Sequence, residues 1–332
     1  MVNAVTVTNY LGESLRLELA HPEKSGIYIK EITGIGPPKA DVSVTDIATM
    51  DGGFYNSARA EKRNIVMTIG FWDWASFIIE ETRHLTYKYF PVKKPLVLVF
   101  ETDSRKAMIS GYVESNEPNI FSKQEEAQIS IVCPYPYFTA VDSNENTIEF
   151  SSTVSEFEFP FYDPPNPEIP DGFSNEVTDE YYQEHGEYER NIKFSTIVKY
   201  SEYNLFYAGD TEVGLMFTIH ASGPATNITI YDLKSGYVMK IDTTKLAALR
   251  DANGNLIGGI RAQDDIIINT VQGNKYIRLL RNGVYTNILN CLDRNTDWFL
   301  LSKGDNLFTY VAESGGDNLM FKAQYSTLYE GI

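Results

Sequence analysis

Apolar and polar residues alternate along several segments of this 332-residue chain, and this alternation is the feature that most constrains its fold. It runs through residues 15–19, 27–32 and 65–69. A period of two places every second side chain on the same face, as in a β-strand with one buried face. Residues 96–100 form a continuous apolar run, which is typical of a strand buried on both faces. The 22 Tyr and 18 Phe residues favour strands as well, and we predict a mainly β fold.

One segment follows a helical period instead. Its apolar residues recur at helical spacing: Trp74, Phe77, Ile78 and Leu85. Asp73 precedes them as a candidate N-cap, because its carboxylate can accept hydrogen bonds from the free amides of a first turn. Pro91 closes the segment, since proline cannot continue a helix. We therefore predict one substantial helix here, packed on a sheet.

A polar stretch at residues 114–126 separates the strand-like segments 108–113 and 128–132. We predict a long hairpin or a projecting arm at this place. Residues 133–138 contain two prolines, which make a stiff exit from the last strand. We therefore place a first domain at residues 1–140 and a second at residues 141–332.

Short strands joined by glycine-containing turns resume at residue 215 and predict a β-sandwich or jelly roll. Residues 163–190 interrupt this second domain with nine acidic side chains and only one arginine. Such a segment has too little apolar surface to offset the entropy of ordering, so we predict a solvated surface loop. Its Tyr181, Tyr182 and Tyr188 suggest the alternative, a docking loop for a neighbouring protein with a basic groove.

The net charge of −17 disfavours a nucleic-acid-binding surface, because such a surface needs lysine and arginine to replace counterions. No stretch approaches the length of a membrane span, and the first residues lack the features of a secretory signal. We therefore expect a soluble protein made in a cytoplasm, without membrane insertion. Cys133 and Cys291 fit no metal or redox spacing, and we expect free buried thiols rather than a disulfide.

No group of residues points to catalysis, a cofactor or a metal ion. The four histidines show no metal-ligand spacing, and no Gly-x-Ser-x-Gly nucleophile elbow is present. Residues 251–255 resemble part of a calcium loop, but the twelfth position is Ala262 rather than Glu, so a β-turn is the better interpretation. Gly34 and Gly36 lack the third glycine of a dinucleotide-binding loop and also indicate a turn. We predict no enzymatic activity; the alternative is an active site built from scattered residues.

Several short motifs follow one another in a recognisable order. In the C-terminal half they begin with a Gly-Asp opening at residues 209–214, a strand ending Ile-Asn-Thr at residues 265–270 and an Asn-Gly turn at residues 281–283. A Leu-rich segment leading to a Gly-x-Asn turn follows at residues 299–306, and a closing Tyr-x-Gly-Ile at residues 329–332. In the N-terminal half they lie at residues 32–38, 51–53, 63–66 and 133–138. This order resembles that of phage distal tail proteins. The acidic residues 163–190 match no feature of that family.

The resemblance implies a ring-forming N-terminal β-barrel or sandwich with one helix and a long hairpin, and a galectin-like C-terminal jelly-roll β-sandwich. It implies a virion structural protein at the tail tip of a phage or phage-derived particle, assembled in the host cytoplasm. A homohexameric ring would join the tail tube or tail-terminal protein to a baseplate hub or tail-associated lysin, and would dock receptor-binding proteins. DNA would pass through this ring without being held. Within the polar stretch 114–126, we expect Asn116, Lys123 and Glu125 to contact the next subunit.

The alternative function is a carbohydrate-binding adhesion module for glycans of the host cell wall. A galectin-like fold invites it, and Trp298 could stack on a sugar ring. Galectins use a His-x-Asn-Pro-Arg strand, whereas His220 is followed by Ala-Ser-Gly. A lone tryptophan between strand-like residues is also more often part of a core, which is the reading we favour for Trp298.

Overall fold

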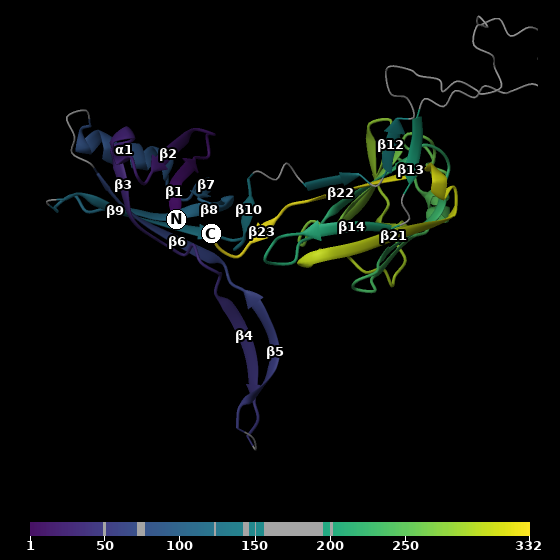
Figure 1. The fold of residues 1–332 in the computed structure, drawn as a ribbon, viewed down its shortest axis with the longest axis horizontal. Helices are drawn as coiled ribbons and strands as arrows, with labels where there is room; N and C mark the ends of the chain where they lie inside the picture. The colour runs from purple at the N-terminus through teal and green to yellow at the C-terminus, as the bar shows by residue number, and fades with distance from the viewer. Residues whose placement is uncertain are drawn as a thin grey trace, which may run out of the picture.

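The computed structural model describes residues 1–48, 51–71, 77–122, 124–141, 146–149, 151–155, 195–199 and 202–332. Two lobes built from antiparallel strands lie side by side, and a long two-stranded hairpin projects away from the first (Figure 1). The predicted mainly β fold is confirmed. Four short 3-10 helices connect strands within the described residues, and their bounds are Pro22–Lys24 (η1), Thr243–Ala248 (η2), Leu289–Cys291 (η3) and Gly316–Asn318 (η4).

The first lobe is a nine-stranded sheet. Seven strands lie in the order β2 (Ser14–Glu18), β1 (Val2–Thr8), β7 (Pro95–Thr102), β8 (Lys106–Pro118), β9 (Glu126–Cys133), β6 (Arg63–Phe71) and β3 (Ile27–Thr33), and β10 (Phe138–Ala140) and β23 (Leu328–Tyr329) extend it beside β8. The core forms on one face, where Ile65, Met67 and Ile69 of β6 are fully buried. The expectation that residues 96–100 are buried on both faces is wrong. Leu96, Leu98 and Phe100 are buried, but the valines between them are half-exposed, because only one face of this sheet is packed.

A single α-helix, α1 (Ile79–Tyr89), lies within the described residues and packs on this core. The predicted helix is confirmed, including its end before Pro91. Its predicted start is wrong: Ile78 occupies the N-cap position without a side-chain cap, and Ile78 itself is 62% exposed. Asp73 and Trp74 fall outside the described residues. Strand β6 is paired as far as Phe71, and the helix begins at Ile79.

The second lobe contains two facing sheets. The larger has the order β11 (Asn146–Glu149), β22 (Leu319–Tyr325), β15 (Met216–Ala221), β18 (Asp264–Asn269), β19 (Tyr276–Arg281) and β20 (Val284–Asn287). The smaller has the order β14 (Glu202–Tyr207), β21 (Gly304–Ser314), β16 (Thr226–Asp232) and β17 (Val238–Ile241), while β12 (Ser151–Ser155) pairs with β13 (Ser195–Lys199). Between the sheets, Phe217, Phe299 and Phe308 pack edge to face with ring centroids 5.4–6.0 Å apart. This is a β-sandwich; its galectin-like character stays a prediction.

The chain crosses between the lobes more than once. The first core draws on residues from Val5 to Phe138, and the second on residues from Tyr203 to Leu328. After the second lobe is complete, β23 returns to pair with β10 in the sheet of the first lobe. The domain division at residue 140 stays a prediction, and residues 329–332 pack with the first lobe although they follow the second. Cys133 and Cys291 are both free and buried, as predicted.

Candidate assembly interface

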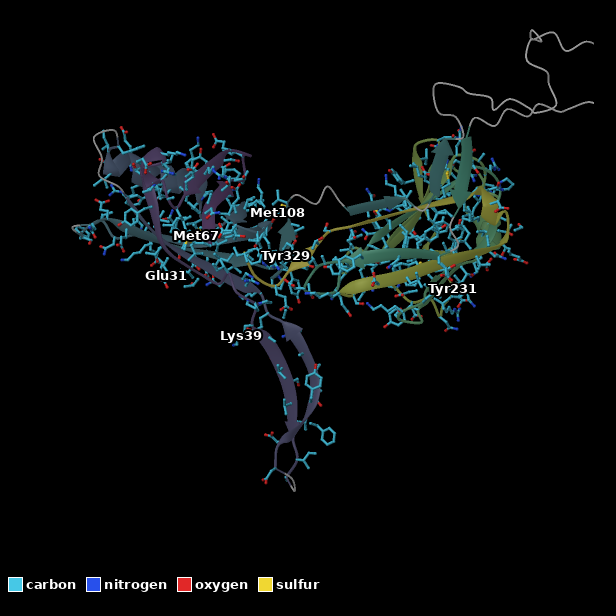
Figure 2. All side chains as sticks on the ribbon, viewed as in Figure 1. Glu31, Lys39, Met67, Met108, Tyr231 and Tyr329 are labelled. Carbon is cyan, nitrogen blue, oxygen red and sulfur yellow. The ribbon has the colours of Figure 1, made fainter. Side chains whose placement is uncertain are left out.

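The hairpin of β4 (Ala40–Asp46) and β5 (Gly53–Ala60), here called the arm, stands clear of both lobes (Figures 1 and 2). Lys39 marks its root in Figure 2. The two strands pair only with each other, and all but one of their residues are exposed. An isolated two-stranded hairpin is marginally stable in water. The arm is therefore an element that a further surface must support.

The two faces of the arm differ in chemistry. Antiparallel partners share a face, so the register assigns to one face the apolar Ala40, Val42, Val44, Tyr55, Ala58 and Ala60, followed toward the tip by Asp46 and Gly53. The opposite, mainly polar face carries Asp41, Ser43, Thr45, Phe54, Ser57 and Arg59. Val42 and Val44 are each 52% exposed and Tyr55 is 65% exposed. A continuous apolar stripe on an otherwise unsupported ribbon is the pattern of a protein-protein contact.

The root of the arm is held rigidly. Gly34 adopts a φ of +81°, and a Cβ atom there would lie 2.0 Å from the carbonyl oxygen of Asn64, so only glycine fits. Arg63, which is 4% exposed, donates to the carbonyl oxygens of Gly34 (2.6 Å) and Gly36 beside the root. These contacts hold the backbone of residues 34–36, which leads toward the arm.

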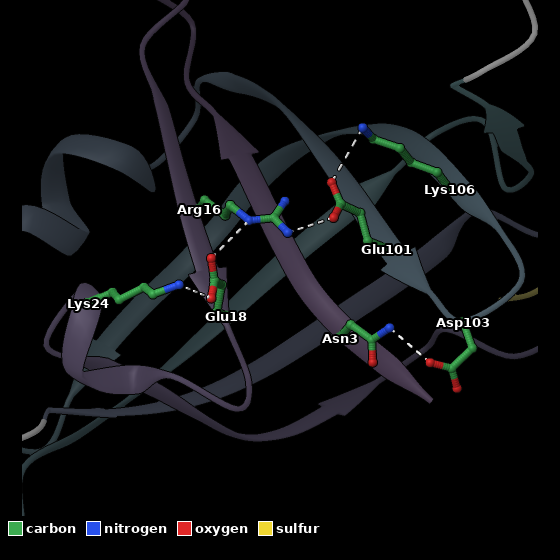
Figure 3. A network of polar contacts seen from close by, with 7 residues as sticks. All are labelled: Asn3, Arg16, Glu18, Lys24, Glu101, Asp103 and Lys106. Atoms are coloured by element: carbon green, nitrogen blue, oxygen red, sulfur yellow. Dashed lines mark hydrogen bonds and ion pairs between the residues drawn. The ribbon is translucent and has the colours of Figure 1, made fainter.

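The exposed edge of the first lobe at β2 is covered by charge instead. In Figure 3, Arg16 of β2 lies 2.7 Å from a carboxylate oxygen of Glu101 on β7 and 3.4 Å from Glu18, while Lys106 reaches the other oxygen of Glu101 at 3.4 Å. The hydrogen bond from Arg16 holds the pKa of Glu101 below its usual range. Charged side chains discourage strand addition at a sheet edge. The β2 edge is thus a poorer assembly surface than the arm.

The residues that the sequence predicts to contact the next subunit are not part of the arm. Residues 114–126 do form a hairpin, between β8 and β9, but this hairpin belongs to the nine-stranded sheet. Asn116 donates to the carbonyl oxygen of Thr86 (3.5 Å), and its buried Oδ1 has no partner among the described residues. Glu125 forms a 2.6 Å ion pair with Arg83 of α1. Both therefore face the helix of their own chain, and their intersubunit role stays a prediction. Lys123 and the tyrosines Tyr181, Tyr182 and Tyr188 lie outside the described residues.

The second lobe offers a small polar pocket beside β16 and β17. It has a volume of about 310 Å³ and is lined by Tyr231, Val238, Lys240, Asp293, Asn295 and Asp297. The loop that carries the last three residues is fixed to β17, because Asp293 N donates to the carbonyl of Lys240 (3.0 Å) and Asp297 N donates to that of Val238 (2.9 Å). An aromatic ring beside hydroxyl-binding groups is chemistry that suits a sugar.

The other candidate positions have structural roles. Trp298 is partly buried and packs against the second core with Lys275 over its ring at 5.4 Å, which agrees with the core reading. Asp251 accepts from the amides of Asn253 and Asn255 and so closes the predicted turn. His220 pairs with Asp265 on the neighbouring strand at 2.7 Å. Among the residues that the structure describes, no three side chains form a metal-binding group, and no helix has the length and hydropathy to cross a membrane.

Sequence reasoning missed both the arm and Arg63. Residues 40–46 do alternate apolar and polar side chains, which could have revealed β4, but residues 53–60 do not. The register of β4 and β5 shifts between Ser43 and Val44, so that the alternation is broken on the other strand. A single arginine at the start of an apolar strand resembles a solvated charge. Only the fold brings four carbonyl groups around it.

No protein-family profile and no curated protein matches the sequence. Among solved structures, the fold is similar to that of the SPP1 Dit protein, described as a paradigm of the hub adsorption apparatus in phages that infect Gram-positive bacteria. The two share 10% identity over 98% of each chain, with a TM-score of 0.57. Chains in two structures of the activated phage P2 baseplate, with Ca and with Sr, match at 12% and 11% identity and TM-scores of 0.41 and 0.39. The match covers 98% of both chains for the first, and 96% of this chain and 97% of the other for the second. The likeness in fold rests on the SPP1 protein.

Proposed function

We propose that this chain is a structural, non-enzymatic protein of a phage or phage-derived tail tip. It forms a hexameric ring that connects the tail tube to the baseplate hub and docks peripheral adhesion proteins. The observation that carries the proposal is the full-length likeness in fold to the SPP1 hub protein, which extends over both lobes. At 10% identity this likeness gives a fold, so the function is our inference from the fold together with the arm.

The arm supplies a contact suited to a closed ring. A ring needs two different patches on each copy, one of which meets the other on the next copy. The apolar face of the arm is the first patch. For the second we propose the outer face of the nine-stranded sheet, where Val97 and Val99 are half-exposed, Met108 is 38% exposed and Tyr112 is 50% exposed. Burying apolar side chains against one another is the main source of stability for such a contact.

The remaining partners follow from this placement. A tail tube or tail-terminal protein would contact one side of the ring, and a hub or tail-associated lysin the other. The second lobe would face outward and could carry receptor-binding proteins, with Tyr181, Tyr182 and Tyr188 as a docking loop. The charge of −17 on each copy suits a ring that lets DNA pass without binding it. The particle location is the virion tail tip, after assembly in the host cytoplasm.

The test is the mass of the purified protein and of two matched variants. Six copies of the 37.5 kDa chain give a ring of about 225 kDa, measurable by mass photometry. Val44→Asp places a carboxylate on the apolar face of the arm and should weaken ring formation at least tenfold, about 1.4 kcal/mol, because a charge must be desolvated. Ser43→Asp puts the same carboxylate on the polar face one residue away and should leave the ring intact. A parent protein that stays monomeric with tube and hub proteins present, or equal effects of both variants, would contradict the proposal.

The second candidate is carbohydrate binding at the pocket beside Tyr231. The observation that favours it is the aromatic ring beside the side chains of Lys240, Asp293 and Asn295 in one fixed pocket. A glycan array of bacterial wall polysaccharides probed with the parent and with Tyr231→Ala tests this candidate. Glycan binding that the substitution abolishes in a monomeric protein would favour the adhesion module over the ring.

A further inference from the structure

Arg63 is a buried cation that forms no direct ion pair in the described part of the chain, although the charge of Glu330 acts favourably on it. Its guanidinium donates to the carbonyl oxygens of Gly34 (2.6 Å), Gly36, Pro136 (2.7 Å) and Glu330 (2.6 Å). Its centre also lies 4.6 Å from the ring centroid of Phe138. Desolvation lowers the pKa of Arg63, which shows the cost of placing a cation here. Four carbonyl dipoles from three separate segments offset that cost.

These three segments belong to different parts of the molecule. Gly34 and Gly36 lead into the arm, Pro136 lies at the exit from the first lobe, and Glu330 follows β23, where the chain has returned from the second lobe to pair with β10. A planar guanidinium with five N–H donors can reach all of them at once. A lysine ammonium, with three donors on one atom, cannot span the same set. Arg63 therefore joins the root of the arm to the exit from the first lobe and to the segment that returns from the second lobe.

Residues 327–332, here called the latch, bind alternately to the two lobes. Leu328 is fixed to the second lobe, because its amide donates to the hydroxyl of Tyr207 (3.1 Å) and its carbonyl accepts from the amide of Asp210 (2.9 Å). On the other side of the latch, Ala140 N donates to the carbonyl of Thr327 (3.0 Å), and Leu328 and Tyr329 pair with β10.

The end of the latch touches the root of the arm itself. Ile332 N donates to the carbonyl oxygen of Ile35 (3.2 Å), two residues before Pro37. A Cβ atom on Gly331 would lie 3.1 Å from that same oxygen and 3.2 Å from the carbonyl carbon of Gly36, so the two backbones are in close contact. Only two residues separate the anchor at Leu328 from the contacts at Gly331. A turn of the second lobe relative to the arm must therefore break these bonds.

We propose that Arg63 and the latch together set the direction of the arm from the position of the second lobe. A partner that docks on the second lobe can thereby change where the arm points, and release of the latch frees the arm. The link between arm direction and ring closure rests on the proposed ring function. The mechanical link between arm and second lobe does not, and it can be tested on the isolated chain.

Spin labels report this link directly. One nitroxide at Ser57→Cys on the arm and one at Gln272→Cys on the second lobe give a distance distribution by pulsed electron paramagnetic resonance. Both positions are exposed. Burial raises the pKa of the native Cys133 thiol to about 11 and also raises that of Cys291, so the labels go to the introduced thiols.

Two substitutions loosen the joint by different routes. Arg63→Lys keeps the charge but loses the shared bonds, and Gly331→Val crowds the root of the arm without removing a donor. Each should at least double the width of the distance distribution while circular dichroism stays that of the parent. Arg59→Lys on the arm, whose arginine is 82% exposed and pairs only with Asp41, is the matched control and should leave the width unchanged.

Unaltered distributions in Arg63→Lys and Gly331→Val would overturn the proposal, whatever happens to their thermal stability. If Arg63→Lys does not fold, Gly331→Val decides, because its added side chain lies at the end of the latch. Mass photometry on the same samples separates the two ideas. Suppose that the parent protein forms no ring and still gives a narrow distance distribution that Gly331→Val broadens. That result rejects the proposed ring and supports the link between the latch and the arm. If Gly331→Val broadens the distance distribution but the ring persists, only the dependence of ring closure on the direction of the arm is rejected.

Discussion

Asp264 shows how this chain buries charge at the scale of single residues. Its side chain is 2% exposed and accepts two parallel hydrogen bonds from Arg281, from Nε at 2.7 Å and from Nη2 at 2.6 Å. The same guanidinium donates to the carbonyls of Ile257 and Gly259. The bond to Asp264 raises the pKa of Arg281. This pair closes one end of the larger sheet of the second lobe, because Asp264 begins β18 and Arg281 ends β19.

Asp264→Asn should lower the free energy of unfolding by about 3 kcal/mol, because it leaves the buried part of the guanidinium without a countercharge. Asp41→Asn is the comparison, since Asp41 pairs with the exposed Arg59 and should lose less than about 1 kcal/mol. Urea unfolding followed by tryptophan fluorescence measures both. Equal losses of unfolding free energy in the two variants would show that other groups stabilise the charge of Arg281 when Asp264 is replaced.

Arg63 and Trp298 illustrate what a sequence reveals about single residues. Trp298 lies between strand-like residues, and the statistical preference of tryptophan for cores was enough to predict its role. Arg63 could not be predicted, because its partners are backbone carbonyls that lie as far as 267 positions away in the chain. Carbonyl groups are the same in every residue, so no pattern of side chains marks such a site.

At the scale of elements, alternation located strands only where the fold provides a core. Strand β6 has Ile65, Met67 and Ile69 on its buried face, and the pattern predicted it directly. The arm has no core of its own, and only β4 alternates, while the register shift breaks the alternation on β5. The start of α1 was misplaced for a different reason. Asp73 suits a helix N-cap by residue type, but a capping preference is local and does not fix where a helix starts; here Ile78 occupies the N-cap position without a side-chain cap.

The ion pairs at the β2 edge should make a small contribution to stability that depends on pH. The folded pKa of Glu101 is below its unfolded value, mainly through the hydrogen bond from Arg16. Its contribution is therefore present above the unfolded pKa and is lost as the pH falls through the folded pKa. Glu101→Gln should cost less than about 1 kcal/mol near pH 6, because the pair is partly exposed, and nothing near pH 2. Urea unfolding of the parent and the variant at both pH values measures this cost. A difference in unfolding free energy that grows toward pH 2 would contradict a lowered pKa of Glu101 in the folded state.

At the scale of the whole molecule, the acidic charge and the apolar arm act against each other. Every copy carries a net charge of −17, so copies in a ring repel one another. The proposed contact joins apolar side chains of the arm to Val99 and Met108 on the outer face of the first sheet, where the pair of Glu101 and Lys106 lies beside them. The range of charge repulsion falls from about 30 Å at 0.01 M salt to about 10 Å at 0.1 M and about 3 Å at 1 M. Added salt should therefore favour the ring.

We expect the ring fraction to rise between 0.01 M and about 0.5 M sodium chloride, as counted by mass photometry at fixed protein concentration. The opposite trend is expected if the ring depends on charged contacts of the hairpin 114–126, including Lys123 and Glu125, because screening weakens exposed ion pairs. Charge reversal at Lys123 separates the two interfaces further. It should leave a ring held by the arm unchanged, whereas it should dissociate a ring held by that hairpin. The ring could instead dissociate in salt and on charge reversal at Lys123, but not in Val44→Asp. That result would place the interface at the polar hairpin rather than at the arm.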